Sequence, residues 1–425
     1  MRILIKNGYR VSMASDIRKG DILIEDDRIK RIGIIDCDAD KIIDATNKIV
    51  MPGLINAHTH VGMALFRGYA DEDELMTWLS ERIWPVEDQM SASDVYYSSM
   101  LSAIEMIKSG TTTFNDNYFF EEETAKAAEK TGMRAILSRC VIGDADEASK
   151  RLAEAEDLYN NWHNKCNGRI KICVGPHAPY TCSPETIKRC VKLADRLGTP
   201  IAIHYLETKD EVKKMRDNYN MTSTEYLKKA GLFNYHVMLA HGVHIDNESL
   251  ETLREISGGI IHNPISNQKL GSGFADITKL RMNGINVALG TDGQGSTNTL
   301  DMFEEIKSAA YIQKALYNSA TAISGEDVLK MATIEGAKVL GIDSEVGSLE
   351  EGKKADIIII DMKKPHLCPA HNIYSLLAYS VNGADVETTI IDGNIVMENR
   401  VINGIDETEI MNACSRIKEC LFNNR

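Results

Sequence analysis

The stretch Pro52-Gly53-Leu54-Ile55-Asn56-Ala57-His58-Thr59-His60 decides the fold of this chain. It breaks at proline and glycine, continues as a short apolar run, and ends in two histidines separated by one residue. Because residues i and i+2 of a β-strand point to the same face, His58 and His60 are expected to project together from one strand end. Two converging imidazoles make half of a metal site. The His-x-His pair alone is also compatible with two ordinary polar histidines.

Outward from this stretch, short apolar runs alternate with helical segments. One helix signal begins at Ser183-Pro184-Glu185 and closes at Gly198, with an N-cap serine, a proline in the first turn and a terminal glycine. Further helices are expected at 91–110 and 276–284. The apolar runs end in turn at His60, Asp116, Cys140, His177, His204, His241, Asn263 and Asp292. Eight alternating βα units favour a closed (β/α)8 TIM barrel over an open sheet.

The two ends of the chain carry a different pattern. Short strands are expected at 3–5, 21–25, 29–32 and 355–361, and a hairpin at 388–396 turns at Asp392-Gly393. Residues 407–422 have helical spacing. These patterns predict three parts in chain order. Residues 1–52 form the first part of a small β-sandwich, residues 53–350 form the barrel, and residues 351–425 complete the sandwich and add a terminal helix.

Composition narrows the partners and the compartment. The chain has 425 residues, of which 43% are hydrophobic and 26% charged, as in globular proteins. Its net charge of −14 argues against nucleic-acid or anionic-membrane partners, which require clustered lysine and arginine. We recognise no signal peptide and no apolar run near the ~20 residues of a membrane span. The nine cysteines form no C-x-x-C pair, so we expect reduced thiols in a cytoplasmic protein.

Four residues at the predicted strand ends form a candidate metal site. His204 ends the fifth apolar run, and Asp292 lies in a glycine-flanked turn after the eighth. Because the carboxyl ends of barrel strands meet at one face, both are expected to lie near His58 and His60. Three histidines and a carboxylate suit a divalent ion such as Zn2+ with an open position for water. The alternatives are a core histidine at 204 and a turn-forming aspartate at 292.

Two more polar residues are expected on the same face of the barrel. Glu207 lies three residues beyond His204 and could act as a general acid and base. His241 ends the sixth apolar run and could orient the attacking water or relay protons. The alternatives are a solvated loop carboxylate and a core histidine.

Four motifs together resemble the amidohydrolase superfamily. They are the 52–60 stretch, His204-x-x-Glu207-Thr208, His262-Asn263-Pro264-x-Ser266-Asn267-x-Lys269-Leu270-Gly271 and Gly290-Thr291-Asp292-Gly293. Within it, nearly the whole chain resembles the methylthioadenosine/S-adenosylhomocysteine deaminases. The resemblance implies one Zn2+ per subunit, held by His58, His60, His204 and Asp292. His177 stands where binuclear relatives carry a bridging lysine.

The resemblance also implies substrate contacts. Glu87 would bind the ribose hydroxyls, and His177 would contact the purine ring with Glu207. Arg139 and Arg151 would bind the carboxylate of a homocysteine tail. A neighbouring subunit could supply one of these arginines, which implies a homo-oligomer, a dimer or a tetramer. The alternative for both arginines is a surface ion pair.

The function that follows is hydrolytic deamination of the adenine ring of a small 5′-modified adenosine to the inosine analogue and ammonia. Asp292 would accept the proton of the attacking water, and Glu207 would protonate the ring nitrogen beside the attacked carbon. His241 would hold the attacking oxygen in line. S-adenosylhomocysteine, 5′-methylthioadenosine, 5′-deoxyadenosine and adenosine all stay open as substrates, as do zinc, iron and manganese as the metal.

Two other functions compete with this hypothesis. One is deamination or dechlorination of another heterocycle, such as guanine or a triazine. A flat triazine would need neither the ribose contact at Glu87 nor the arginines at 139 and 151, so these residues favour a ribose with an acidic tail. The other is a non-catalytic barrel scaffold that has lost its metal. The intact set of four ligands argues against it.

Overall fold

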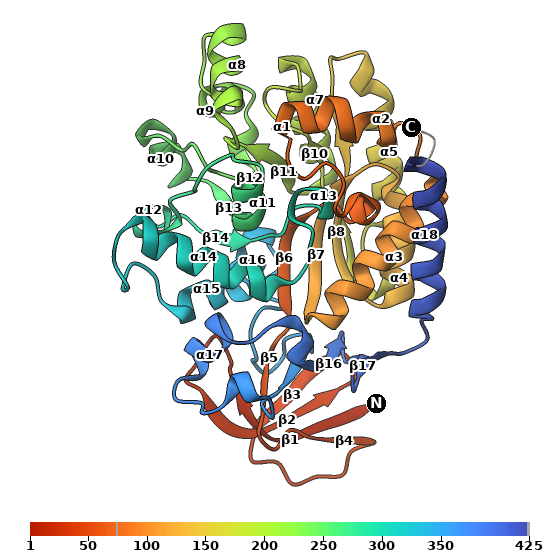
Figure 1. Cartoon of the computed structure of the whole chain (residues 1–425), viewed down its shortest axis with the longest axis vertical. Coiled ribbons are helices and arrows are strands. Elements are labelled where there is room, and N and C mark those ends of the chain that lie inside the picture. Colours follow the sequence, from red (N-terminus) through yellow and green to blue (C-terminus); the bar gives the residue numbers. More distant parts are fainter. Residues whose placement is uncertain (74, 423–425) are drawn as a thin grey trace.

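A barrel of parallel strands forms the centre of the molecule in the computed structural model, which describes residues 1–73 and 75–422 (Figure 1). The predicted TIM-barrel class is confirmed. The strands, with the fourth position split in two, are β6 (Leu54–Thr59), β7 (Thr111–Tyr118), β8 (Arg134–Val141), β9 (Ile170–Ile172), β10 (Gly175–Pro176), β11 (Ile201–Tyr205), β12 (His236–His241), β13 (Ser257–His262) and β14 (Val287–Leu289). They pair in two halves, β10-β8-β7-β6 with β9 beside β8, and β11-β12-β13-β14.

Backbone hydrogen bonds bridge both seams between these halves. At the β14–β6 seam, the N–H of Asp292 donates to the carbonyl of His58 at 3.0 Å. At the other seam, the N–H of His204 donates to the carbonyl of His177 at 2.9 Å. The first seam therefore brings two residues of the candidate metal site side by side, and the second brings one of them beside His177.

Helices surround the barrel, and their ends follow the capping residues of the sequence. Ser183 caps α7 by accepting the N–H of Thr186 at 3.2 Å, and Gly198 ends it with a left-handed φ of 64°. The helices are α1 (Leu75–Thr77), α2 (Trp84–Glu87), α3 (Ala92–Lys108), α4 (Glu121–Thr131), α5 (Glu147–Trp162), α6 (Lys165–Gly168), α7 (Pro184–Leu197), α8 (Lys209–Tyr219), α9 (Ser223–Lys229), α10 (Asn247–Leu253), α11 (Pro264–Lys269), α12 (Ile277–Met282), α13 (Gln294–Thr297), α14 (Met302–Leu316), α15 (Gly325–Met331), α16 (Ile334–Leu340), α17 (Ile373–Tyr379) and α18 (Glu407–Phe422). Within the described residues, none of them is both long and apolar enough to cross a membrane.

Strands from both termini form one sheet at the opposite end of the molecule from the barrel mouth (Figure 1). They are β1 (Arg2–Arg10), β2 (Arg18–Glu25), β3 (Arg28–Gly33), β4 (Lys41–Asp44), β5 (Lys48–Pro52), β15 (Ile357–Asp361), β16 (Val386–Ile391), β17 (Asn394–Glu398) and β18 (Val401–Ile402). Their order is β18-β17-β16-β15-β5-β1-β2-β3, with β4 on β1. Isoleucines from both ends of the chain, such as Ile5, Ile24, Ile359 and Ile390, share one buried core.

Gly53 separates β5 of the terminal sheet from β6 of the barrel, at the break that the sequence shows at Pro52-Gly53. The terminal helix α18 lies along α3 of the barrel (Figure 1). There Lys108 Nζ contacts Glu407 Oε2 at 2.7 Å, and Cys414 Sγ donates to the carbonyl of Tyr97 at 3.3 Å. The boundaries of the three predicted parts stay a prediction.

A buried ion cluster joins the barrel to the terminal sheet. Arg134, at the start of β8, donates from Nε to Asp356 Oδ2 at 2.8 Å and from Nη2 to Asp356 Oδ1 at 3.0 Å. Its Nη2 also lies 3.4 Å from Asp392 Oδ1, which Lys354 contacts at 3.0 Å. The side chains of Arg134 and Asp356 are only 3% and 2% exposed. The two regions are therefore held together by charges that water does not screen.

Replacing Arg134 with methionine is expected to lower the free energy of unfolding by about 3–5 kcal/mol, because Asp356 would stay buried without its cation. The matched control is Arg2→Met, which removes an exposed pair with Glu25 and should leave the free energy of unfolding almost unchanged. Urea unfolding of both variants measures the difference. Equal losses would show that the buried cluster contributes no more than a surface pair.

Candidate metal centre

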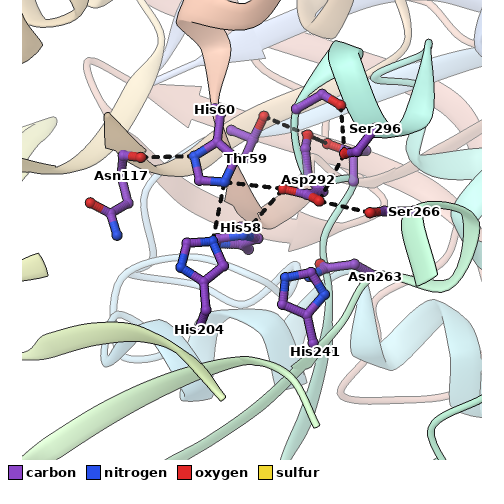
Figure 2. Close-up of polar contacts among 12 residues, drawn as sticks. His58, Thr59, His60, Asn117, His204, His241, Asn263, Ser266, Asp292 and Ser296 are labelled. Carbon is purple, nitrogen blue, oxygen red and sulfur yellow. Dashed lines mark hydrogen bonds and ion pairs between the residues drawn. The ribbon is translucent and has the colours of Figure 1, made fainter. Parts of the chain in front are cut away.

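Four side chains meet at the carboxyl end of the barrel strands, as the sequence predicts for this set (Figure 2). One ligand-type atom from each of His58, His60, His204 and Asp292 lies within 4.8 Å of those of the other three. Asp292 Oδ1 is 3.4 Å from His58 Nε2 and 3.1 Å from His60 Nε2. His204 Nε2 is 3.2 Å from His60 Nε2. These separations are those of atoms that can share one ion.

Backbone carbonyls orient two of these rings. His60 Nδ1 lies 2.7 Å from the carbonyl of Asn117, and His204 Nδ1 lies 2.7 Å from the carbonyl of His177. A carbonyl only accepts, so each Nδ1 carries a proton, and the neutral form of each ring, which is the form that binds a metal, presents a bare Nε2. Two bare nitrogens 3.2 Å apart repel each other unless a cation lies between them. The donor set therefore fits a metal ion, with the outer nitrogens held as in known metal sites.

Asp292 is fixed from several sides. Its backbone adopts a left-handed φ of 65°, a conformation that aspartate tolerates better than most residues. The hydroxyls of Ser266 and Ser296 donate to Oδ2 at 2.7 and 2.8 Å, which leaves Oδ1 facing the histidines (Figure 2). Although burial opposes its charge, the neighbouring rings of His58 and His60 hold the pKa of Asp292 well below its ordinary value. Asp292 is therefore an anion at the centre of the site.

Burial keeps two of the ligand histidines neutral. It lowers the pKa of His58 to about 4 and the pKa of His204 well below its ordinary value. A metal ion binds the neutral imidazole, so the protein environment already favours the ligating form.

Glu207 and His241 lie beside the four ligands. Glu207 is buried and follows β11 after a turn in which Leu206 has a φ of 50°. Its Oε2 lies 3.8 Å from His241 Nε2, and Ser272 Oγ lies 3.4 Å from its Oε1. Burial raises the pKa of Glu207, which favours a protonated carboxyl that can donate. His241 Nδ1 lies 2.8 Å from Asn267 Oδ1, and with the Nδ1 proton donated to that oxygen the Nε2 of His241 is an acceptor.

A cavity of about 870 Å³ opens from this centre. That volume lies within the usual range for small-molecule sites. Its walls include the residues that the sequence analysis associates with chemistry or substrate, apart from His58: His60, Glu87, Arg139, Arg151, His177, His204, Glu207, His241 and Asp292. The structure thus gathers residues spread over more than 200 positions of the chain around one space.

Glu87, at the end of α2, has a specific partner that the sequence did not indicate. Tyr118 Oη donates to Glu87 Oε1 at 2.5 Å. The Tyr118 ring stacks on Phe119 with centroids 4.0 Å apart. A Cβ at Gly62 would lie 2.2 Å from the Tyr118 ring, so no side chain fits at that position without a shift of the ring. Burial raises the pKa of Glu87 to about 7, and the Tyr118 hydrogen bond opposes that rise.

The remaining predicted contacts also line the cavity. His177 Nδ1 lies 2.8 Å from Thr181 Oγ1, and burial lowers the pKa of His177 to about 3, so its ring is neutral. Arg151 Nη1 donates to the carbonyl of Ile142 at 2.7 Å. Arg139 Nε donates to Glu154 at 2.7 Å. The ion pair considered as an alternative for the arginines is therefore present at Arg139, on the cavity wall.

Several supporting residues carried no predicted role. Ser266 and Asn267 belong to the 262–271 motif, and Ser296 follows Asp292 by four residues in a glycine-rich turn. Their hydroxyl and amide groups act on Asp292 and His241, as described above. The signal available for Ser296 was that it is a polar residue four positions after the ligand Asp292. Tyr118 had no such signal, because Glu87 lies 31 positions away.

Comparison with known proteins places this geometry in a family. The amidohydrolase family model matches residues 49–396. A 5-methylthioadenosine/S-adenosylhomocysteine deaminase of Thermoanaerobacter pseudethanolicus is 51% identical over 418 residues, which cover 97% of each chain. A 5′-deoxyadenosine deaminase of Methanosarcina mazei is 45% identical over 423 residues, 98% of each chain. The crystal structure of an adenosine deaminase from Xanthomonas campestris with bound zinc has a TM-score of 0.95 at 31% identity and covers 99% of this chain and 98% of its own. This chain therefore belongs to the amidohydrolase family and is a hydrolytic enzyme.

Proposed function

We propose that this enzyme deaminates the adenine ring of 5′-modified adenosines by hydrolysis, using one zinc ion per subunit. The observation that carries the proposal is the shared cavity. Its inner end holds the metal-site residues together with Glu207, and its walls hold Glu87 and two arginines. The deaminase names of the two relatives and the zinc in the Xanthomonas structure support the same assignment.

The ion would be held by His58, His60, His204 and Asp292, whose donor atoms fit a divalent cation by the lone-pair argument above. When bound, zinc supplies the polarisation that makes water a nucleophile near neutral pH. Three histidines and one carboxylate leave room for that water, as in catalytic rather than structural zinc sites.

The chain's own residues would handle the protons. Asp292, an anion with Oδ1 toward the site, would accept the proton of the attacking water. Glu207, which burial favours in the protonated form, would donate to the ring nitrogen beside the attacked carbon. His241 would accept a hydrogen bond at Nε2 and hold the attacking oxygen in line. Asp292 would then pass its proton to the departing ammonia.

The cavity walls would select the substrate. Glu87 would accept hydrogen bonds from the ribose hydroxyls, and the neutral ring of His177 would contact the purine. Arg139 and Arg151 would bind the carboxylate of an amino-acid tail. We also propose that the enzyme is a cytoplasmic homo-oligomer, in which a neighbouring subunit could supply one of the arginines to the site. Because the net charge of the chain is −14, we propose no nucleic-acid or membrane partner.

The deciding experiment is a substrate panel on zinc-loaded and chelator-treated enzyme. Loss of adenine absorbance is expected with 5′-methylthioadenosine, S-adenosylhomocysteine, 5′-deoxyadenosine or adenosine, and metal removal should abolish it until zinc is restored. Guanine and a chlorotriazine belong in the same panel. If the enzyme turned over guanine or the chlorotriazine and none of the adenosines, its substrate would be another heterocycle and the proposal would be wrong. A chain that binds no metal and turns over no compound would be a scaffold.

Tyr118→Phe tests the ribose contact. Because Phe removes the hydrogen bond that holds Glu87, we expect KM for a riboside to rise roughly tenfold while kcat changes little. Steady-state kinetics at fixed zinc measures this. Tyr159→Phe is the control, since it removes a hydroxyl bonded to the carbonyl of Leu197 away from the cavity. An equal fall in kcat would mean that Tyr118 supports the metal centre instead.

A further inference from the structure

An ion pair on the cavity wall joins strand β8 to helix α5. Arg139 Nε donates to Glu154 Oε2 at 2.7 Å, and both residues line the cavity. Their side chains are 17% and 39% exposed, so water reaches the pair in the free protein. An ion pair that water reaches contributes little to folding stability. Its position at the proposed tail subsite therefore needs another explanation.

The charges around this pair form an ordered pattern. Arg151 and Glu154 lie three residues apart on α5 and therefore share one face of that helix. Arg139 is anchored by Nη1, which donates to the carbonyl of Cys140 at 2.7 Å. The only other cation near Glu154 in the described part of the chain is Lys150, whose Nζ is 3.8 Å from Oε1 and whose side chain is 87% exposed. The wall thus presents two anchored cations, Arg139 and Arg151, and beside Arg139 a carboxylate that a ligand can approach.

We infer that Glu154 receives the ammonium group of a zwitterionic amino-acid tail while Arg139 and Arg151 receive its carboxylate. The inference rests on the proposed function and assigns a specificity-determining residue to it. An α-amino acid carries one anion and one cation about two bonds apart, and the Arg139–Glu154 pair offers their complements side by side. When the tail binds, Glu154 Oε2 keeps its contact with Arg139, and Glu154 Oε1 contacts the ammonium of the tail in place of Lys150.

The same arrangement ranks three tails by charge. A neutral methylthio tail leaves the pair untouched. A tail with a carboxylate and no amine places a second anion beside Glu154, and like charges at that range repel. A zwitterionic tail satisfies both partners. Glu154 therefore favours the zwitterion over the simple anion, which the arginines alone cannot do.

Glu154→Gln tests the assignment with three substrates, namely S-adenosylhomocysteine, its analogue lacking the amino group, and 5′-methylthioadenosine. We expect kcat/KM to fall roughly fivefold for the first, to rise for the second and to stay unchanged for the third. The control is Glu156→Gln on the same helix. Glu156 pairs with Arg196 and is not a cavity residue, so none of the three values should change.

Three results would overturn the inference. An equal fall for both charged tails would mean that Glu154 only positions Arg139. No change for S-adenosylhomocysteine would remove Glu154 from the site. If Asp157→Asn lost the preference for the zwitterionic tail and Glu154→Gln kept it, the ammonium would bind Asp157, another carboxylate on this wall. Calorimetric affinities of the two charged ligands give the same comparison without turnover. Failure of the wild-type enzyme to deaminate any adenosine would instead refute the proposed function.

Discussion

Replacing Asp292 with asparagine is expected to lower deaminase turnover by more than about 100-fold, and by as much as about 10⁴-fold. The amide nitrogen that replaces one carboxylate oxygen cannot accept a proton. Asparagine also has one carbonyl oxygen in place of two carboxylate oxygens. It therefore cannot present an oxygen to the histidines and accept the hydroxyls of Ser266 and Ser296 at the same time. Turnover and bound zinc should be measured on the same preparation at saturating zinc, so that loss of the ion is separated from loss of the proton acceptor.

Asp246→Asn is the matched control for this substitution. Asp246 caps α10 by accepting the N–H of Ser249 at 2.8 Å, and asparagine caps helices equally well. Its turnover should equal that of the wild type. If Asp292→Asn bound zinc and kept wild-type turnover, the proposed proton route through Asp292 would be wrong.

Glu207→Gln is expected to reduce kcat/KM by about 10²–10⁴-fold while zinc content stays that of the wild type. Glutamine keeps the size of the side chain and loses the titratable proton that the buried carboxyl holds. Glu207 is not one of the four residues whose donor atoms converge, so the substitution leaves the ion's ligands in place. Steady-state kinetics and metal analysis on one sample measure both quantities.

Glu225→Gln controls for the change of glutamate to glutamine. Glu225 accepts the N–H of Thr222 at 2.7 Å in the capping box of α9, a role that glutamine also fills. No kinetic change is expected there. A Glu207→Gln enzyme with wild-type kcat/KM would assign the proton donation to another group, and loss of zinc in that variant would make Glu207 part of the metal centre.

The barrel could be predicted because its strand ends coincide with chemically distinctive residues. The predicted end at His241 is the end of β12, and β11 runs only one residue past His204. The deviations have local causes. Asp292 lies three residues beyond β14, in the left-handed turn that aims its carboxylate inward. The fourth strand position is split into β9 and β10, which periodicity in so short a run does not reveal.

The site was predictable only where the fold alone brings residues together. His58, His60, His204 and Asp292 each lie at or just beyond the end of a barrel strand, and parallel strands in a barrel end at one face. Tyr118 with Glu87 and Arg139 with Glu154 are contacts between a strand end and a separate helix. Those contacts depend on how the connecting segments fold, which sequence spacing does not encode.

The interleaving of the two termini in one sheet has a consequence for synthesis. Strand β5 lies between β1 and β15, so its outer edge has no partner until Ile357–Asp361 has been made. A ribosome adding about 5–20 residues per second needs roughly 15–60 s to travel from β5 to β15. During that time the nascent chain carries an apolar strand with an open hydrogen-bonding edge, the kind of surface on which chains aggregate. The terminal sheet is therefore completed only late in translation, and the yield of folded enzyme depends on how well that edge is shielded until then.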